Sequence, residues 1–308
     1  MKTRKPICRS CRADTTKQMI CADFVFGSRG EHNFWQCNEC DLVYLWPIPS
    51  EEEEARFYAK EFEKYMSHRS AGERDWSGPE AHIKTNQDHV KRRLRFLEDD
   101  FALGKDILEI GCSSGFMMDA FKDAGLCPIG IEPSSLFLDF LKERGHVAFR
   151  SLDELQNSME DKTFDLIVHF FVLEHIRDTE KFLSEQIELL KPNGKIIAEI
   201  PCVNDPLTSL YKIPAFERFY WSIAHHYYFS PRSLSYILSK LGYSYELIPE
   251  QRYDLSNHIV WLQDGKPGGQ CKYNHIFSEN TIESYKLDLM RNWHCDTIFL
   301  KLTNTRSI

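Results

Sequence analysis

From Asp106 to Ile200 the chain alternates short apolar runs with segments of helix length. The apolar runs are 107–110, 128–131, 164–168 and 195–200, and the segments between them that have helix length are 116–124, 135–144 and 179–190. Strands that alternate with helices form βαβ units and a parallel sheet, which binds ligands at the carboxyl ends of its strands. We therefore expect an α/β fold whose ligand lies on the first strand-to-helix turn.

That turn reads Glu109-Ile-Gly111-Cys112-Ser113-Ser-Gly115-Phe116. A dinucleotide fingerprint requires glycine at 111, 113 and 116, and the serine and phenylalanine found here argue against a dehydrogenase. Glycine at 111 and 115, with an acid two residues before the first, resembles the first motif of class I S-adenosylmethionine-dependent methyltransferases. A second acid, Glu132, follows Gly111 by 21 residues at the end of the next strand.

The resemblance continues through Asp165 to Asp178, which includes Leu-Glu-His175, and through Leu190-Lys-Pro-Asn-Gly194. It spans roughly residues 80–250 and implies a Rossmann-like methyltransferase sheet, mostly parallel with one antiparallel strand. It also implies S-adenosylmethionine as cofactor, with the Glu132 carboxylate on the ribose hydroxyls. The resemblance implies that the cofactor is bound by the turn and the residues after the second strand, namely Glu109, Gly111, Cys112, Ser113, Gly115, Phe116, Glu132 and Pro133. It also implies that Ser151 and Leu152 approach the adenine, and that His169 and Phe170 lie near the sulfonium.

Ten cysteines are many for a chain of 308 residues, and four of them form two matched pairs. Cys8-Arg-Ser-Cys11 and Cys37-Asn-Glu-Cys40 each have two intervening residues. Two such pairs, brought together by a hairpin, give the closed four-sulfur shell of a structural zinc site. Four unrelated thiols and a redox-active pair are the alternatives.

The segment between the two pairs reads as strand, turn and strand, with the strands at 24–26 and 34–36. We therefore expect a small N-terminal zinc ribbon that the metal helps to fold, since some 45 residues bury too little apolar surface alone. Pro47 and Pro49 mark its end.

The rest of the chain is divided by its local patterns. Ser50 and Glu53 form a capping box for a helix from Glu51 toward Tyr65, and a polar loop follows over 67–79. A second amphipathic helix ends near Gly104, with its arginines, Arg92 and Arg93 among them, on faces other than the apolar one.

At the C-terminus we expect a closing hairpin of strands 244–248 and 257–262, a helix over 279–291 and a strand over 297–302. Which late strand occupies the buried antiparallel position stays open. The expected regions are a zinc ribbon (1–46), a helical linker or lid (47–104), the cofactor-binding core (105–265) with an acceptor-site insertion (203–229), and a C-terminal extension (266–308).

Candidate acceptor-site residues follow the fifth strand. After an aromatic-rich stretch the chain reads His225-His226-Tyr-Tyr-Phe-Ser-Pro231, which resembles a segment of sugar methyltransferases in which the histidine is the proposed base. Those proteins also carry an N-terminal cysteine-rich zinc module. The carbon-methylating ones have tyrosine and glutamate where this chain has Ser222 and Ala224, so oxygen or nitrogen is at least as fitting an acceptor. The catalytic candidates are His225, His226 and His175, because histidine is the natural base near neutral pH.

The sequence therefore favours methyl transfer to a sugar or nucleotide sugar of surface-glycan or secondary metabolism. One alternative is a ribosomal or transfer RNA methyltransferase that holds RNA with the ribbon. A net charge of −8, and only seven Lys/Arg against five Asp/Glu in residues 1–50, disfavour it. Another is a catalytically silent interaction subunit. No apolar stretch suggests a membrane span or secretory signal, so we expect a cytoplasmic protein.

Overall fold

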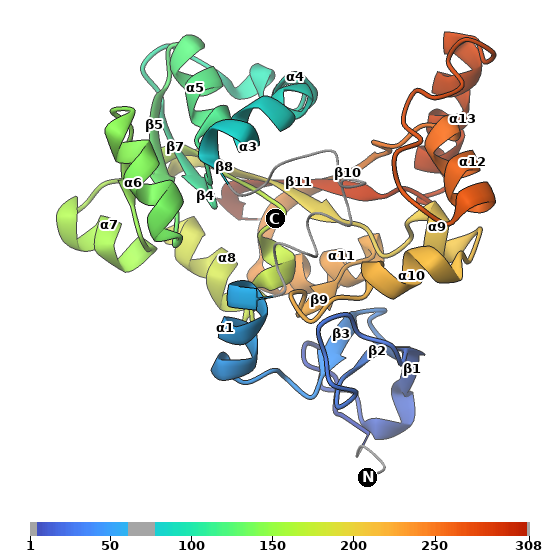
Figure 1. Ribbon diagram of the computed structural model, residues 1–308. Helices are drawn as coiled ribbons and strands as arrows, with labels where there is room; N and C mark the ends of the chain where they lie inside the picture. Colours follow the sequence, from blue (N-terminus) through green and yellow to red (C-terminus); the bar gives the residue numbers. More distant parts are fainter. Residues whose placement is uncertain (1–4, 61–77, 307–308) are drawn as a thin grey trace.

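The computed structural model describes residues 5–60 and 78–306, which form two sheets with helices around the larger one (Figure 1). The strands are β1 (Gln18–Ala22), β2 (Asn33–Cys37), β3 (Val43–Trp46), β4 (Asp106–Ile110), β5 (Cys127–Ile131), β6 (Val147–Phe149), β7 (Phe164–Phe170), β8 (Leu190–Pro201), β9 (Tyr227–Tyr228), β10 (Tyr243–Glu250) and β11 (Thr297–Arg306). The α-helices are α1 (Glu51–Lys60), α3 (Pro79–Thr85), α4 (Gln87–Leu94), α5 (Phe116–Asp123), α6 (Ser135–Glu143), α7 (Leu152–Ser158), α8 (Thr179–Glu188), α9 (Pro206–Ser209), α10 (Pro214–Tyr220), α11 (Pro231–Leu241), α12 (Leu255–Asp264) and α13 (Glu279–Arg291). Short 3-10 turns lie at η1 (Thr15–Lys17), η2 (Glu98–Asp100) and η3 (Leu173–His175).

The larger sheet has seven strands in the order β10-β11-β8-β7-β4-β5-β6. Its β6, β5, β4, β7 and β8 pair in parallel, whereas β11 is antiparallel to both of its neighbours. The expected Rossmann-like class I methyltransferase sheet, with one antiparallel strand, is therefore confirmed. The strand over 297–306 takes the buried antiparallel position that the sequence left open.

Two layers of helices cover this sheet (Figure 1). One apolar cluster joins the sheet to α7, α8 and α11 and also contains Cys8, Cys37 and Cys40. A second cluster on the opposite face joins it to α5 and the α4 segment. Because the N-terminal cysteines share the first cluster with the sheet, the N-terminal segment is packed against the core.

The smaller sheet has the order β1-β2-β3-β9, antiparallel throughout. Its first three strands come from the N-terminal segment, but the fourth, β9, comes from the segment that carries the candidate histidines. The N-terminal sheet is therefore completed by a strand some 180 residues away in sequence.

Two expected strands were wrong. The first ribbon strand is β1, earlier than the expected 24–26, where Phe26 makes only an isolated bridge to Ser222. Residues 257–262 lie in helix α12, which begins where the Asp254 carboxylate accepts a hydrogen bond from the Asn257 amide at 2.8 Å. It ends at Gly265, a left-handed residue that stops a helix.

The expected capping box of α1 is present. The Ser50 amide donates to the Glu53 carboxylate at 2.8 Å, and the Glu53 amide donates to the Ser50 hydroxyl at 3.2 Å. The end of the helix expected toward Tyr65 and most of the expected loop over 67–79 lie outside the described residues. Within residues 5–60 and 78–306, none of the helices combines the length and the apolar character that a membrane crossing requires.

Candidate cofactor and acceptor site

The glycine-rich turn between β4 and α5 is closely packed. Gly111 has φ +75°, and a Cβ there would lie 2.7 Å from the Val172 side chain. Gly115 has φ +79°, caps α5, and a Cβ there would lie 2.5 Å from Leu141. Both positions therefore exclude side chains through conformation and space together. The turn is held to the next strand, since the Ile131 carbonyl accepts from the Gly111 amide at 2.8 Å.

Glu132 follows β5 and braces this turn. One carboxylate oxygen accepts from the Ser113 amide and the other from the Ser134 amide, both at 2.8 Å. Burial raises the pKa of Glu132, while the two amide bonds act in the opposite direction. Each carboxylate oxygen can accept a second hydrogen bond, so the group keeps capacity for two ligand hydroxyls.

Glu109 lies at the end of β4 and is 2% exposed. Its Oε2 is buried without a hydrogen-bond partner among the described residues. Burial raises the pKa of this carboxyl to about 8, and the nearby Arg93 opposes the shift. A buried acceptor without a partner costs about 1–3 kcal/mol, so a bound donor would remove a real penalty.

Arg93 is buried and Arg92 is partly buried, although neither belongs to the apolar pattern that predicted their helix. The Arg93 Nε donates to Glu199 at 2.7 Å, and Arg92 pairs with the same carboxylate at 2.5 Å. The Arg93 guanidinium also lies 4.2 Å from the centre of the Phe170 ring, which places it over the end of β7. Complete burial raises the pKa of Glu199, but Arg93, Arg92 and Arg252 together hold it at about 2. A glutamate inside the apolar run 195–200 is the sequence signal that could have pointed to this cluster.

The remaining residues expected in the turn and after β5 take definite places. Cys112 is 1% exposed and packs with Met118 and the α6 side chains. Phe116 is 6% exposed at the start of α5, with its ring 5.7 Å from that of His82. Pro133 is exposed, and its carbonyl accepts from Arg150 at 2.9 Å. Of these, Cys112 and Phe116 form the packed base of the turn.

The four residues expected near the adenine and the sulfonium have unlike surroundings. The Ser151 hydroxyl caps α7 by accepting from the Glu154 amide, and Leu152 packs partly buried against the core. His169 is fully buried with its ring 5.6 Å from that of Phe182 on α8, and burial lowers its pKa to about 3. Phe170 points to the opposite face, toward Arg93.

His175 and His225 are brought together by two separate segments. Their ring centres are 4.8 Å apart in an edge-on arrangement. The His175 Nδ1 lies 2.8 Å from the Ala224 carbonyl, and its Nε2 lies 4.0 Å from a carboxylate oxygen of Glu174, which is 1% exposed. Because a carbonyl only accepts hydrogen bonds, Nδ1 carries the hydrogen and Nε2 keeps the lone pair.

His226 faces elsewhere. Its Nε2 lies 3.0 Å from the Glu54 carboxylate of α1, and its amide donates to the Glu174 carbonyl at 2.7 Å. Burial lowers the pKa of His226 to about 3. Its backbone carbonyl accepts from the Leu45 amide at 3.0 Å, so His226 links the segment that carries the candidate histidines to β3.

The four N-terminal cysteines converge, with their sulfur atoms all within 4.8 Å of one another. The Cys8 and Cys40 sulfurs are 3.6 Å apart, and those of Cys11 and Cys37 are 3.5 Å apart. A tetrahedral zinc ion with Zn–S bonds of about 2.3 Å places its sulfurs about 3.8 Å from one another. The spacing of the sulfurs therefore fits such an ion.

Comparison with known proteins gives a family model described as "Methyltransferase domain", which matches residues 82–248. Among curated relatives, a ubiquinone biosynthesis O-methyltransferase of Coxiella burnetii is 26% identical over 128 residues, which are 40% of this chain and 55% of the relative. An uncharacterized methyltransferase of Anoxybacillus flavithermus is 27% identical over 169 residues, 52% of this chain and 77% of the relative. The chain thus spans about half the length of the first of these relatives.

Solved structures are similar at a lower level. A SAM-dependent methyltransferase from Archaeoglobus fulgidus is 22% identical with a TM-score of 0.47, covering 70% of this chain and 93% of that one. The phosphoethanolamine N-methyltransferase 2 of Haemonchus contortus is 16% identical with a TM-score of 0.47, covering 85% and 61%. The family model itself matches more than half of the chain, and the seven-stranded sheet agrees with it. The chain belongs to the methyltransferase-domain family, with the fold of class I S-adenosylmethionine-dependent methyltransferases.

Proposed function

We propose that the protein transfers a methyl group from S-adenosylmethionine to a hydroxyl of a sugar or nucleotide sugar. The relatives named as O-methyltransferases support oxygen as the acceptor atom. The sugar class is supported by the resemblance of residues 225–231 and of the cysteine module to sugar methyltransferases. Nitrogen and carbon are the other acceptor atoms that the sequence leaves open.

The turn after β4 fits the cofactor. The buried Oε2 of Glu109 has no hydrogen-bond partner in the described part of the chain, which suits the ammonium of the methionine portion. Glu132 already orders the turn through two amides and has acceptor capacity for the ribose hydroxyls. When bound, the cofactor supplies an activated methyl group on a sulfonium, so the protein must position the acceptor, exclude water and remove a proton.

One chain of contacts carries the proposal. Gly111 in the cofactor turn is packed against Val172, which immediately precedes the 3-10 turn of Glu174 and His175. His175 in turn lies beside His225. The two candidate general bases, His175 and His225, therefore lie beside the backbone that borders the cofactor turn. Methyl transfer to a proton-bearing acceptor requires a base in such a position.

The geometry of His175 suits a general base. The Ala224 carbonyl fixes the ring in the tautomer that leaves Nε2 as the proton acceptor. Once Nε2 is protonated, the ring becomes a cation 4.0 Å from the Glu174 carboxylate, which stabilises it. His225 shares this site through its ring contact, whereas the contact of His226 with Glu54 supports a positioning role for that residue.

The donor set of the N-terminal cluster supports a structural zinc ion. Four thiolates with no other ligand form a closed shell, which leaves no coordination position for a substrate. The ion would be held by Cys8, Cys11, Cys37 and Cys40 and would stabilise the sheet to which β9 belongs.

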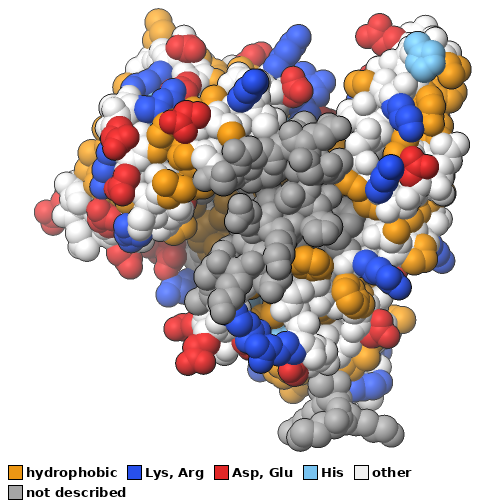
Figure 2. All heavy atoms as spheres, in the orientation of Figure 1, with side chains coloured by type: hydrophobic (Ala, Val, Ile, Leu, Met, Phe, Trp, Pro, Cys, Tyr) orange, Lys and Arg blue, Asp and Glu red, His pale blue; other side chains and the backbone are white. Residues whose placement is uncertain are grey.

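A small-molecule acceptor is favoured over RNA by the distribution of charge. On the face shown in Figure 2, the described Lys and Arg side chains are interspersed with Asp and Glu and do not form one basic stripe. Broad neutralisation of phosphates is what supplies affinity for RNA without sequence specificity. An overall charge of −8 works in the same direction.

The test is release of S-adenosylhomocysteine by the zinc-loaded protein with a panel of nucleotide sugars, simple phenols and short RNAs. We expect turnover with a nucleotide sugar, and loss of about 100-fold or more in His175→Gln and in His225→Gln, within the range for removal of a general base. The exposed His275→Gln is the matched control. Turnover only with phenols or RNA would refute the sugar assignment, and full activity in both histidine variants would refute the assignment of the base.

A further inference from the structure

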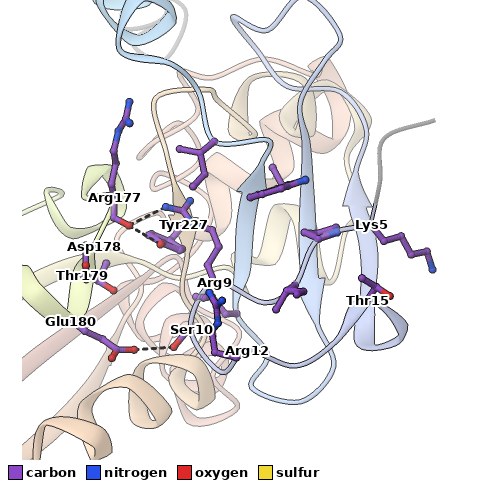
Figure 3. Close-up of a pocket in the computed structure, with 15 residues that line it drawn as sticks. Lys5, Arg9, Ser10, Arg12, Thr15, Arg177, Asp178, Thr179, Glu180 and Tyr227 are labelled. Atoms are coloured by element: carbon purple, nitrogen blue, oxygen red, sulfur yellow. Dashed lines mark hydrogen bonds between the residues drawn. The ribbon is translucent and has the colours of Figure 1, made fainter. Parts of the chain in front are cut away.

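A cleft of about 780 Å³ lies between the N-terminal cysteine segment and the turn that precedes α8 (Figure 3). Its volume is within the range of about 300–1,000 Å³ that is typical of small-molecule sites. The residues that matter for its chemistry are Lys5, Arg9, Arg12, Trp46, Arg177 and Tyr227. We refer to it as the ribbon cleft.

The ribbon cleft carries excess positive charge although the chain as a whole is acidic. Four Lys and Arg side chains and two acids line it. Both acids are already engaged: Asp178 caps α8 by accepting from the Lys181 amide at 3.0 Å, and Glu180 pairs with Lys240 at 2.7 Å. Glu180 is thus compensated by Lys240, whereas Asp178 keeps its charge, and the lining retains an excess of positive charge.

The cations differ in how far they are compensated. Arg177 pairs with Glu54 at 2.9 Å. Arg9 lies 4.3 Å from the centre of the Tyr227 ring and donates to the Arg177 carbonyl, but its buried Nη1 has no hydrogen-bond partner among the described residues. Lys5 and Arg12 are exposed and have no ion pair within residues 5–60 and 78–306. The cleft thus offers at least three donors to an anion.

Apolar groups stand beside these donors. Trp46 lines the cleft together with Ile7 and Ile48, which are 50% and 40% exposed. Two exposed isoleucines and an indole ring in the lining of one cleft suit a flat or apolar portion of a ligand rather than a bare inorganic ion. The combination matches a phosphorylated organic molecule such as a nucleoside diphosphate.

Two residues that line the cleft are close in sequence to the candidate general bases His175 and His225. Arg177 follows His175 by two residues, and Tyr227 follows His225 by two residues. Two residues of extended chain span about 7 Å. The Tyr227 hydroxyl donates to the Arg177 carbonyl at 2.9 Å, which ties the two walls together as Figure 3 shows.

From these observations we propose that the ribbon cleft binds the diphosphate and base of a nucleotide-linked acceptor. The cations hold the diphosphate, and Trp46 with its isoleucine neighbours contacts the base. This inference rests on the proposed function for the identity of the acceptor, but binding in the cleft is measurable without methyl transfer.

The experiment is calorimetric titration of the full-length, zinc-loaded protein with UDP and, separately, with inorganic pyrophosphate. We expect UDP to bind at least fivefold more tightly than pyrophosphate, and Arg12→Glu to weaken UDP binding tenfold or more while leaving S-adenosylmethionine binding unchanged. Lys5→Glu is a second variant of an exposed residue, and Arg291→Glu on α13, whose side chain is 73% exposed, is the control with the same change of charge.

The outcomes separate the two proposals. The proposal that the ribbon cleft binds the nucleotide would be overturned by no UDP binding at millimolar concentration, or by equal weakening of UDP binding in Arg12→Glu and Arg291→Glu. This holds even if nucleotide sugars are methylated. UDP binding that depends on Arg12, without any methyl transfer to nucleotide sugars, would retain the cleft and refute the proposed function. Equal affinity for UDP and pyrophosphate would overturn the assignment of the base to Trp46.

Discussion

Loss of metal from the four-cysteine cluster should release the segment that carries His225. The segment is bonded to the N-terminal residues by the Leu45 amide of β3 on the His226 carbonyl (3.0 Å) and, through the loop between β1 and β2, by the Phe26 amide on the Trp221 carbonyl (2.7 Å) and the Ile223 amide on the Phe26 carbonyl (3.0 Å). The test proteins are the chelator-treated wild type and Cys37→Ser, with Cys127→Ser, an exposed cysteine outside the cluster, as the control.

The expected size of the effect follows from those contacts. These three backbone hydrogen bonds contribute about 1 kcal/mol each, so their loss alone costs about 3 kcal/mol, and loss of the pairing of β3 with β9 adds to it. Since about 1.4 kcal/mol corresponds to a factor of ten, the open state of the segment should become roughly 100-fold more populated. Exposure of the Tyr228 ring, which is 1% exposed in the structure, would add to this.

Hydrogen exchange followed by mass spectrometry measures this opening without an acceptor. We expect exchange in peptides covering 221–229 to accelerate about 100-fold, while β4 and β7 keep their protection and S-adenosylmethionine affinity changes less than threefold. Unchanged exchange in 221–229 after verified loss of metal would refute the view that the metal holds this segment. A loss of S-adenosylmethionine affinity as large as the change in exchange would show that the metal also affects the cofactor site of the larger sheet.

Three further predictions concern buried carboxylates. Glu132→Ala removes the acceptor of two amides and the proposed acceptor of the ribose hydroxyls, so S-adenosylmethionine affinity by calorimetry should fall at least tenfold; unchanged affinity would contradict the assignment. In the folded protein the pKa of Glu109 is raised to about 8, above the ordinary value of 4.5. Between these two pH values the folded, cofactor-free protein holds a proton that the unfolded chain has released. The free energy of unfolding should therefore decrease as pH rises from 5 to 8. Glu109→Gln should flatten that part of the thermal-denaturation profile, and a slope identical to wild type would exclude this carboxyl as its source. Glu199→Ala leaves the buried Arg93 without its carboxylate partner and removes one of the two carboxylates near Arg92, and it should reduce the free energy of unfolding in urea by about 3–5 kcal/mol, whereas a change below 1 kcal/mol would show that the cluster is not structurally important.

The parts of the molecule that the sequence predicts well are those determined over short distances along the chain. Gly111 and Gly115 are required by left-handed backbone within one turn, and the sequence spacing of Glu132 follows from a single βαβ unit. The two cysteine pairs are likewise local patterns, and the sulfur atoms do converge.

Failures occur where a side chain's partner lies far away in sequence or where local patterns are ambiguous. Arg93 and Glu199 are separated by 106 residues, and an arginine in a polar helix gives no sign of a buried partner. Residues 257–262 contain an apolar run too short to distinguish strand from helix by periodicity, and the decisive features are the caps at Asp254 and Gly265.

The pairing of β3 with β9 combines both situations and bears most on function. As a two-residue strand, β9 has too little sequence pattern to be recognised, and its partner strand is about 180 residues away. Yet this pairing fixes where His225 lies relative to His175, because the Leu45 amide holds the carbonyl of the next residue, His226. A segment that the sequence separates from the core therefore pairs with the strand beside the candidate histidines. Variants at Val43 or Tyr44 that disrupt strand pairing should thus lower turnover while leaving the affinity for S-adenosylmethionine unchanged.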